Sequence, residues 1–241
     1  MNEIDIDSEL KKILDQASQN YKQGNLNNAE ILYKKVLDMY PRHVPTLINL
    51  GVVFQKRKNF NASIKCYKKA IIENPNNIIA NFNLASLHNY FGEDDEAIRL
   101  FKKIVKISPN YILAKENLGM IYLRDFDLDK SEKYFLEVLK KDKNLTKIRY
   151  ILFFISKIKN IIKLEKNKNF KQAIQESEKL ISNDPVKIEP YLYCLKSLIK
   201  LKKIKTTNHI LKIIKILGAD HILEKFFKKE KIDLKFLRIN V

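Results

Sequence analysis

Residues 44–77 read VPTLINLGVVFQKRKNFNASIKCYKKAIIENPNN, and residues 78–111 read IIANFNLASLHNYFGEDDEAIRLFKKIVKISPNY. The two stretches have the same length and carry similar residue types at matching positions. The same interval of 34 residues separates the members of two further series, Pro41, Pro75 and Pro109, and Asn49, Asn83 and Asn117. A fixed period of this size indicates a solenoid, in which one supersecondary unit is repeated. Solenoids present long binding surfaces, so we expect binding rather than chemistry.

The composition favours helices and a reducing compartment. The 241 residues include 5 Gly and 6 Pro, too few for a chain rich in hairpins, and 45% are hydrophobic. Cys66 and Cys194 fall in different repeats, so we expect neither a disulfide framework nor a cysteine-based zinc site. The N-terminus is acidic and lacks the apolar region of a signal peptide, and no apolar run approaches the ~20 residues of a transmembrane helix. These features predict a cytoplasmic protein.

Four regular units, 10–43, 44–77, 78–111 and 112–145, each predict two antiparallel helices. Small residues recur where the two helices approach, and aromatic residues recur where they fill the gap to the next unit. The small residues are Gly51, Ala85 and Gly119 in the first helices and Ala29, Ser63, Ala97 and Ser131 in the second; the aromatic residues are Tyr33, Tyr67, Phe101 and Phe135. We expect the second helices to be N-capped by Asn27, Asn61, Asp95 and Asp129. Gly24 and Gly92 stand where left-handed residues end the first helices.

This pattern resembles the tetratricopeptide repeat, whose signature runs Trp-x2-Leu-Gly-x2-Tyr, then Ala-x3-Phe, then Pro. The tryptophan is absent, and Leu47, Asn81 and Lys115 stand in its place. The resemblance implies an all-α, right-handed superhelical solenoid of about six helix pairs. It also implies a binding scaffold like the bacterial scaffold proteins of this family or the repeat region of O-linked N-acetylglucosamine transferases, without the catalytic domain.

The second half of the chain continues the array less regularly. Residues 146–221 predict two divergent units, the first of which matches the repeat at Phe170, Ala173 and Pro185. Eight residues are inserted before it, and we expect them to form two extra turns of a helix near 147–168. A final amphipathic helix, near 221–231, is expected to cap the array. The remaining boundaries are an acidic N-terminal segment, 1–9, and a C-terminal capping helix and tail, 222–241.

The resemblance also implies a binding site. In this family the first helices line the inner groove, and an asparagine before Leu-Gly faces it; in the transferases such asparagines grip the backbone of an extended peptide. Asn49, Asn83 and Asn117 match that position, and an amide can pair with both groups of a peptide unit. The alternative is that these asparagines only support helix packing. The flanking groove positions are Lys22, Lys56, Phe82, Ser86, Tyr90, Met120 and Arg124.

The charge leaves a second class of partner open. The net charge is +18, and residues 146–241 hold 23 Lys and Arg against 9 Asp and Glu. Nucleic acid or an anionic surface is therefore an alternative partner, with Tyr191, Tyr193, Phe226 and Phe227 as candidates for base stacking. Its lysines are Lys157, Lys159, Lys163, Lys166, Lys168, Lys200, Lys202, Lys203, Lys205, Lys228, Lys229 and Lys231. A drift in composition toward lysine would give the same charge without any ligand.

No pattern in the sequence predicts catalysis. The four histidines are scattered, and His88 occupies an aromatic position of the repeat, so we expect it to be packed in the core. No phosphate-binding glycine loop, nucleophile elbow or dinucleotide fingerprint is present. We therefore expect no enzyme, cofactor or metal, and a protein or peptide partner. Serving as the targeting arm of an enzyme on another chain, and self-association, are left open.

Overall fold

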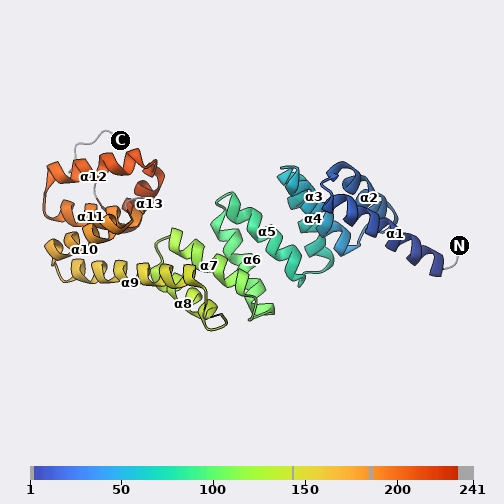
Figure 1. The fold of residues 1–241 in the computed structure, drawn as a ribbon, viewed down its shortest axis with the longest axis horizontal. Helices are drawn as coiled ribbons and strands as arrows, with labels where there is room; N and C mark the ends of the chain where they lie inside the picture. The colour runs from blue at the N-terminus through green and yellow to red at the C-terminus, as the bar shows by residue number, and fades with distance from the viewer. Residues whose placement is uncertain (1–2, 143, 185–186, 233–241) are drawn as a thin grey trace. The chain divides into compact units, whose positions relative to one another are not determined.

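The computed structural model describes residues 3–142, 144–184 and 187–232, and every regular element in them is an α-helix (Figure 1). The predicted all-α class is therefore confirmed. The helices are α1 (Glu3–Lys22), α2 (Leu26–Met39), α3 (Val44–Lys56), α4 (Phe60–Glu73), α5 (Ile78–Tyr90), α6 (Asp94–Ile107), α7 (Ile112–Arg124), α8 (Leu128–Leu139), α9 (Thr146–Lys166), α10 (Phe170–Asn183), α11 (Ile188–Lys200), α12 (Ile204–Ile216) and α13 (Asp220–Glu230). Because α1 begins at Glu3, it includes most of residues 1–9, which the sequence analysis sets apart.

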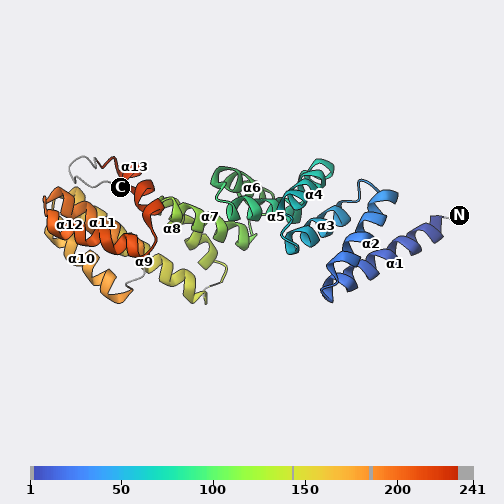
Figure 2. The same cartoon turned by 90° about the horizontal axis from the view of Figure 1, so that it is seen from above.

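The chain divides into two compact units, Met1–Ile121 (unit 1) and Tyr122–Val241 (unit 2). In unit 1 the helices pack in consecutive pairs, α1 with α2, α3 with α4 and α5 with α6, and each pair also contacts the next (Figure 2). Unit 2 repeats this arrangement with α9 and α10 and with α11 and α12. Predicted helix pairs are thus present in both units, three in unit 1 and two in unit 2.

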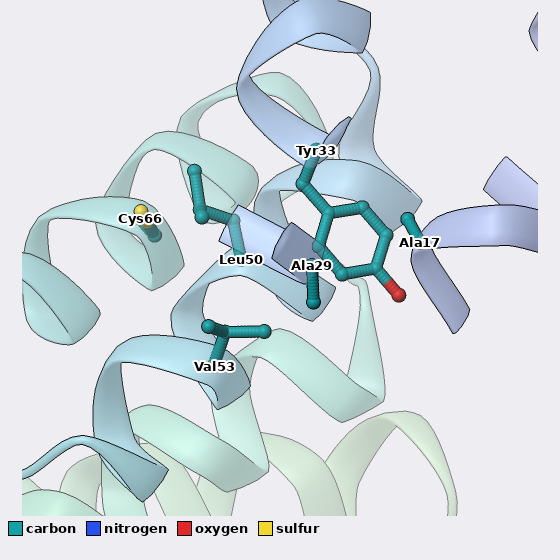
Figure 3. Packing of buried hydrophobic residues seen from close by; sticks show 6 residues of the cluster. All are labelled: Ala17, Ala29, Tyr33, Leu50, Val53 and Cys66. Carbon is teal, nitrogen blue, oxygen red and sulfur yellow. The ribbon is translucent and has the colours of Figure 1, made fainter. Parts of the chain in front are cut away.

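The core of unit 1 is formed by residues that recur with the repeat. Figure 3 shows Ala17, Ala29, Tyr33, Leu50 and Val53 converging from α1, α2 and α3, with Cys66 of α4 beside them. Every one of these side chains is buried. Alanine lets the helix backbones approach, and the larger side chains fill the space that remains between neighbouring pairs.

Helices α3 and α4 approach each other closely at Gly51. A methyl group at Gly51 would lie 2.5 Å from Cε1 of Tyr67, whose ring is fully buried. Ser63 of α4 donates a hydrogen bond of 2.8 Å to the carbonyl oxygen of Gly51. Gly51 therefore lets α3 and α4 approach closely, as predicted, and the ring that it meets belongs to Tyr67 of the same repeat.

The predicted N-caps are wrong by two positions. Asn61 and Asp129 lie inside the first turns of α4 and α8, and the caps are Asn59 and Asp127. The side chain of Asn59 accepts a bond of 3.2 Å from the N–H of Ala62, and Asp127 accepts one of the same length from Lys130. Asn27 and Asp95 are likewise inside their helices, behind the cap positions Asn25 and Glu93. The helices start earlier because the residue after each cap, which is apolar in α2, α4 and α8 and aspartate in α6, is already helical.

The first helices end in left-handed residues. Gly24 (φ +80°) and Gly92 (φ +74°) confirm the predicted C-terminal glycines. The matching positions in other repeats are not glycine but keep the same conformation, so the turn geometry is imposed by the fold even where the side chain opposes it. These residues are Lys58, Phe126, Lys168 and Lys202, with φ between 55° and 59°.

The extra residues of the fifth repeat lie in α9. This helix has 21 residues, whereas α3, α5 and α7 have 13 each, so the insertion extends a helix rather than a loop. Phe154, Ile155, Ile158 and Ile161 are buried along it. Phe170 begins α10 and Ala173 is buried, as expected, whereas Pro185 lies outside the described residues.

The expected C-terminal helix is present as α13. It follows α12 through the turn at Gly218, and Figure 1 shows it beside α11 and α12. Leu223, Phe226 and Phe227 form its buried side. The sequence analysis did not predict that α13 also reaches the turn before α8, where Phe226 meets Phe126.

Candidate functional site

The three candidate asparagines occupy one register of unit 1. Asn49, Asn83 and Asn117 are each the sixth residue of their helices, α3, α5 and α7. Asn49 is exposed, and Asn83 and Asn117 are partly exposed. All three amides therefore reach the surface at equivalent points of successive repeats.

Two of these amides lie near a tyrosine of the preceding repeat. Asn49 lies near the hydroxyl of Tyr33, and Asn83 lies near that of Tyr67, which donates its hydrogen bond of 3.1 Å to Gln55. Burial raises the pKa of Tyr33, and it raises that of Tyr67 to about 12, while the nearby amides act in the opposite direction. An asparagine amide offers two donors and an acceptor with two lone pairs, so a nearby hydroxyl leaves most of its capacity for a ligand.

The third amide has different partners because Phe101 of α6 carries no hydroxyl. Asn117 donates a bond of 2.8 Å to the carbonyl oxygen of Leu113, and Asn89 donates one of 3.4 Å to Oδ1 of Asn117. The local contacts of the series therefore vary from repeat to repeat, whereas its register does not.

The basic flanking residues all lie at helix ends. Lys22 and Lys56 are the exposed last residues of α1 and α3 in unit 1. Arg124, also exposed, ends α7 and belongs to unit 2. Each cation complements the negative end of a helix dipole, which is a sufficient structural reason for its position.

Two flanking residues take part in packing. The half-buried ring of Phe82 lies 5.7 Å from that of Phe101 and 5.5 Å from that of Tyr111, edge to face in both cases. Ser86 donates a hydrogen bond of 2.8 Å to the carbonyl oxygen of Phe82. Only part of each side chain is therefore available to a ligand.

The most exposed aromatic residue of the predicted set is Tyr90, with 71% of its surface accessible. Its ring centroid lies 5.5 Å from that of Phe60 and 5.1 Å from that of Phe91, which is itself exposed. Sequence reasoning missed Phe60 and Phe91, although two adjacent aromatics at a helix end are an unusual surface feature. Met120 of α7 is also exposed.

Both cysteines and one histidine, His88, are buried, whereas His209 and His221 are exposed. His88 is buried and its Nδ1 contacts the carboxylate of Glu93, so its predicted place in the core is confirmed. Burial raises the pKa of the Cys66 thiol to about 11 and that of Cys194 to about 12, which keeps both protonated. Among the described residues, no group of His, Cys, Asp and Glu could hold a metal ion. Within the same residues, none of the helices is long and apolar enough to cross a membrane.

The basic half of the chain lacks the stacking platform that was considered for it. Tyr191, Tyr193, Phe226 and Phe227 are all buried, so none of them presents a ring face to a base. They are core residues because they stand on the apolar sides of α11 and α13.

Some of the lysines in the basic half are paired: Lys159 contacts Asp129 at 2.6 Å and Glu132 at 2.8 Å. Others, such as Lys200 and Lys203, are exposed, and the side chain of Lys205 lies outside the described part. The nucleic-acid alternative therefore keeps its charge but loses the four aromatic residues as base-stacking candidates.

Comparisons with known proteins agree with this architecture. Family models described as tetratricopeptide repeat match residues 44–77, 78–111 and 114–144. A comparison with curated protein sequences gave no significant match.

Solved structures resemble the chain in fold. A Pseudomonas aeruginosa pilF structure is 16% identical, with a TM-score of 0.55, covering 92% of this chain and 98% of its own. A tetratricopeptide repeat protein from Parabacteroides merdae is also 16% identical, with a TM-score of 0.55 and coverages of 95% and 96%. A Thermobaculum terrenum O-GlcNAc transferase mutant is 18% identical, with a TM-score of 0.52, over 58% of this chain and 27% of its own. Residues 44–111 and 114–144 therefore consist of tetratricopeptide repeats, and the solved structures share the fold of the chain.

Proposed function

We propose that the protein is an interaction scaffold that binds an extended peptide segment of a partner protein along the first helices of unit 1. Asn49, Asn83 and Asn117 pair with the peptide backbone, and Tyr90 and Met120 contact its side chains. The observation that carries this proposal is the common register of three surface amides on α3, α5 and α7. Tetratricopeptide-repeat arrays typically act by binding, and this chain offers a repeated donor and acceptor rather than a single pocket.

Backbone recognition follows from the chemistry of the amide. A peptide unit presents one N–H and one C=O, and an asparagine side chain can satisfy both at once. Each net hydrogen bond contributes about 1 kcal/mol, so losing one bond at each of three amides weakens binding by roughly a hundredfold. Side-chain selectivity must then come from the flanking residues, of which Lys22 and Lys56 suit an acidic residue in the ligand.

The test begins with peptides that are selected by display on the wild-type chain. Their affinity is then measured for the wild type and for the triple variant N49A/N83A/N117A. We expect a loss of roughly a hundredfold in affinity. Selected peptides should also lose binding when N-methyl groups replace alternate backbone N–H donors. The matched control is N27A/N61A/N110A, which removes three exposed amides from other positions and should bind as the wild type does.

A second variant separates binding from packing. Y33F/Y67F removes the hydroxyl groups that lie near Asn49 and Asn83 but leaves the amides in place. On the proposal, this variant binds the peptides at least as well as the wild type. Unchanged binding by N49A/N83A/N117A, with a lower unfolding midpoint, would show that the asparagines only support packing.

A further inference from the structure

Unit 2 has a second candidate binding surface, which is covered by the C-terminal helix α13. α13 meets α11 at Tyr193, and Tyr193 is the sixth residue of α11. This is the register that the asparagines hold in α3, α5 and α7. The helix therefore lies on the part of α11 that corresponds to the candidate binding face in unit 1.

An aromatic anchor holds α13 in place. Phe226 is fully buried, and its ring centroid lies 5.3 Å from that of Phe126 and 5.1 Å from that of Tyr193, edge to face with both. Phe227 and Leu223 are buried beside it. An amphipathic helix that places an aromatic residue between two partner aromatics is a common form of helix recognition in a groove.

A network of ion pairs lies at the C-terminal end of α13. Nζ of Lys196 lies 2.9 Å from Glu165 of α9 and 2.7 Å from Glu230 of α13, and Ser197 donates a bond of 2.6 Å to Glu165. Burial alone would lower the pKa of Lys196, but the bonds to Glu230 and Glu165 raise it. Glu165 alone already neutralises Lys196. The second ion pair, from Glu230, forms only while α13 is docked and is lost when α13 leaves.

The lysines around the end of α13 suit a more acidic helix than α13. Glu230 lines two cavities, of about 490 Å³ and about 460 Å³. Lys163 and Lys166 line the first, Lys200 and Lys202 line the second, and none of the four pairs with a carboxylate among the described residues. Asp127 and Asp129 also line the first cavity and pair with Lys130 and Lys159, and Lys229 of α13 pairs with Asp125. In the second cavity α13 adds Lys231 beside Lys200 and Lys202, so like charges meet where the helix ends.

The attachment of α13 is weak outside its anchor. The helix has 11 residues, a length that is marginal for an isolated helix, and the left-handed Gly218 precedes it. Its ion pairs from Lys225 and Lys229 to Asp125 are 3.1 and 3.7 Å long and substantially exposed, and such pairs contribute little. Docking thus depends chiefly on Phe226, Phe227 and Glu230.

From these contacts we infer that the surface under α13 is a binding site for an amphipathic helix of a partner protein, with an aromatic anchor followed by carboxylates. α13 is its exchangeable internal occupant. The partner helix places its aromatic residue between Phe126 and Tyr193 and its carboxylates among Lys163, Lys166 and Lys200. Binding releases α13, so the covered and open states of unit 2 exclude each other.

The test uses the full chain and fluorescein-labelled synthetic peptides of residues 220–232. Binding is measured by fluorescence anisotropy to the wild-type chain and to F226A, with K228A as the control, because Lys228 is exposed on the same helix. F226A should release α13 from the site. The peptide should then bind F226A about tenfold tighter than the wild type, because α13 no longer competes with it. A folded F226A chain, verified by circular dichroism, that binds no tighter than the wild type would overturn the inference.

Charge preference is tested with two peptides of equal net charge. One carries K231E, at a cavity position, and the other carries K228E, at an exposed position. The K231E peptide should bind about threefold tighter at low salt, and the difference should vanish at about 1 M salt. The chain variant K200E should abolish this preference, whereas K212E, which changes an exposed lysine of α12, should preserve it. Equal binding of both peptides at low salt would contradict the acidic partner.

Two further measurements keep the outcome unambiguous. If F226A does not fold, E230Q replaces it, with E224Q as the matched control at an exposed carboxylate of the same helix. If α13 is exchanged between two copies instead, the wild type is a dimer by light scattering and F226A is a monomer, which would overturn the inference. The triple asparagine variant of unit 1 should bind the peptides unchanged, so failure here is independent of failure of the proposed function.

Discussion

Replacing Gly51 with alanine tests how closely the helices of a pair must approach. The added Cβ would lie 2.5 Å from Cε1, 2.9 Å from Cδ1 and 3.0 Å from Cζ of Tyr67. Carbon atoms in a packed core lie about 3.5–4.0 Å apart, so the ring or α3 must move by about 1 Å. Tyr67 is fully buried and its hydroxyl donates a bond of 3.1 Å to Gln55, so the ring has no free direction to move in.

The expected cost follows from three contributions. Overpacking a core costs about 1–3 kcal/mol, and a weakened bond to Gln55 adds about 1 kcal/mol. The better helix propensity of alanine offsets about 1 kcal/mol of this. We therefore expect G51A to lower the free energy of unfolding by about 1–3 kcal/mol.

Urea denaturation followed by circular dichroism measures this change. The third repeat supplies the control, because Ala85 is fully buried at the matching position, with Phe101 at the position of Tyr67. The double variant G51A/Y67F recreates that pair and should recover part of the lost stability. An unfolding midpoint of G51A at or above that of the wild type would refute the packing argument.

Two other predictions address the caps and the buried thiols. N59A should lower the free energy of unfolding by about 1 kcal/mol, because Asn59 caps α4. N61A should change the free energy of unfolding by less than about 0.5 kcal/mol. Urea denaturation of the two variants decides which position is the cap. Burial raises the pKa of Cys66 from 9.0 to about 11 and that of Cys194 from 9.0 to about 12. Stability should therefore be unaffected by these thiols below pH 9. It should fall as the pH rises toward 11, by about 1.4 kcal/mol per pH unit for each thiol, because only the unfolded chain releases the protons. The urea midpoint of C66A/C194A should fall less between pH 8 and pH 10 than that of the wild type; an equal fall would contradict the assignment.

The helix pairs and their packing could be read from the sequence because the residues that make them lie within one period. Gly51 and Tyr67 lie 16 positions apart, within one repeat, and are in contact in space, so their residue types report their contact. The cap positions could not be read in the same way. Asn59 and Asn61 are equally good capping residues, and only the backbone shows that the helix has already begun at Phe60.

The candidate site was predictable in register but not in its contacts. Asn49 and Asn83 occupy the positions that the repeat assigns to them, yet their proximity to Tyr33 and Tyr67 depends on how neighbouring pairs pack. In Asn117 the register is the same and the partner differs, since Phe101 offers no hydroxyl. The residue types therefore indicated a binding face without indicating what each amide already bonds.

The sequence by itself determined the repeat, the helix pairs and the elongated helix α9, because each depends on contacts that are local in the chain. Only the tertiary structure decided where α13 lies. Its apolar side was visible as a pattern, but such a pattern shows that a face must be covered and not which residues cover it. Phe126 and Phe226 are far apart in the chain, and their contact follows from the packing of the helices between them. Because α13 packs in this way, Tyr193, Phe226 and Phe227 are buried in the core and are not available at the surface, where the sequence had suggested them as stacking residues.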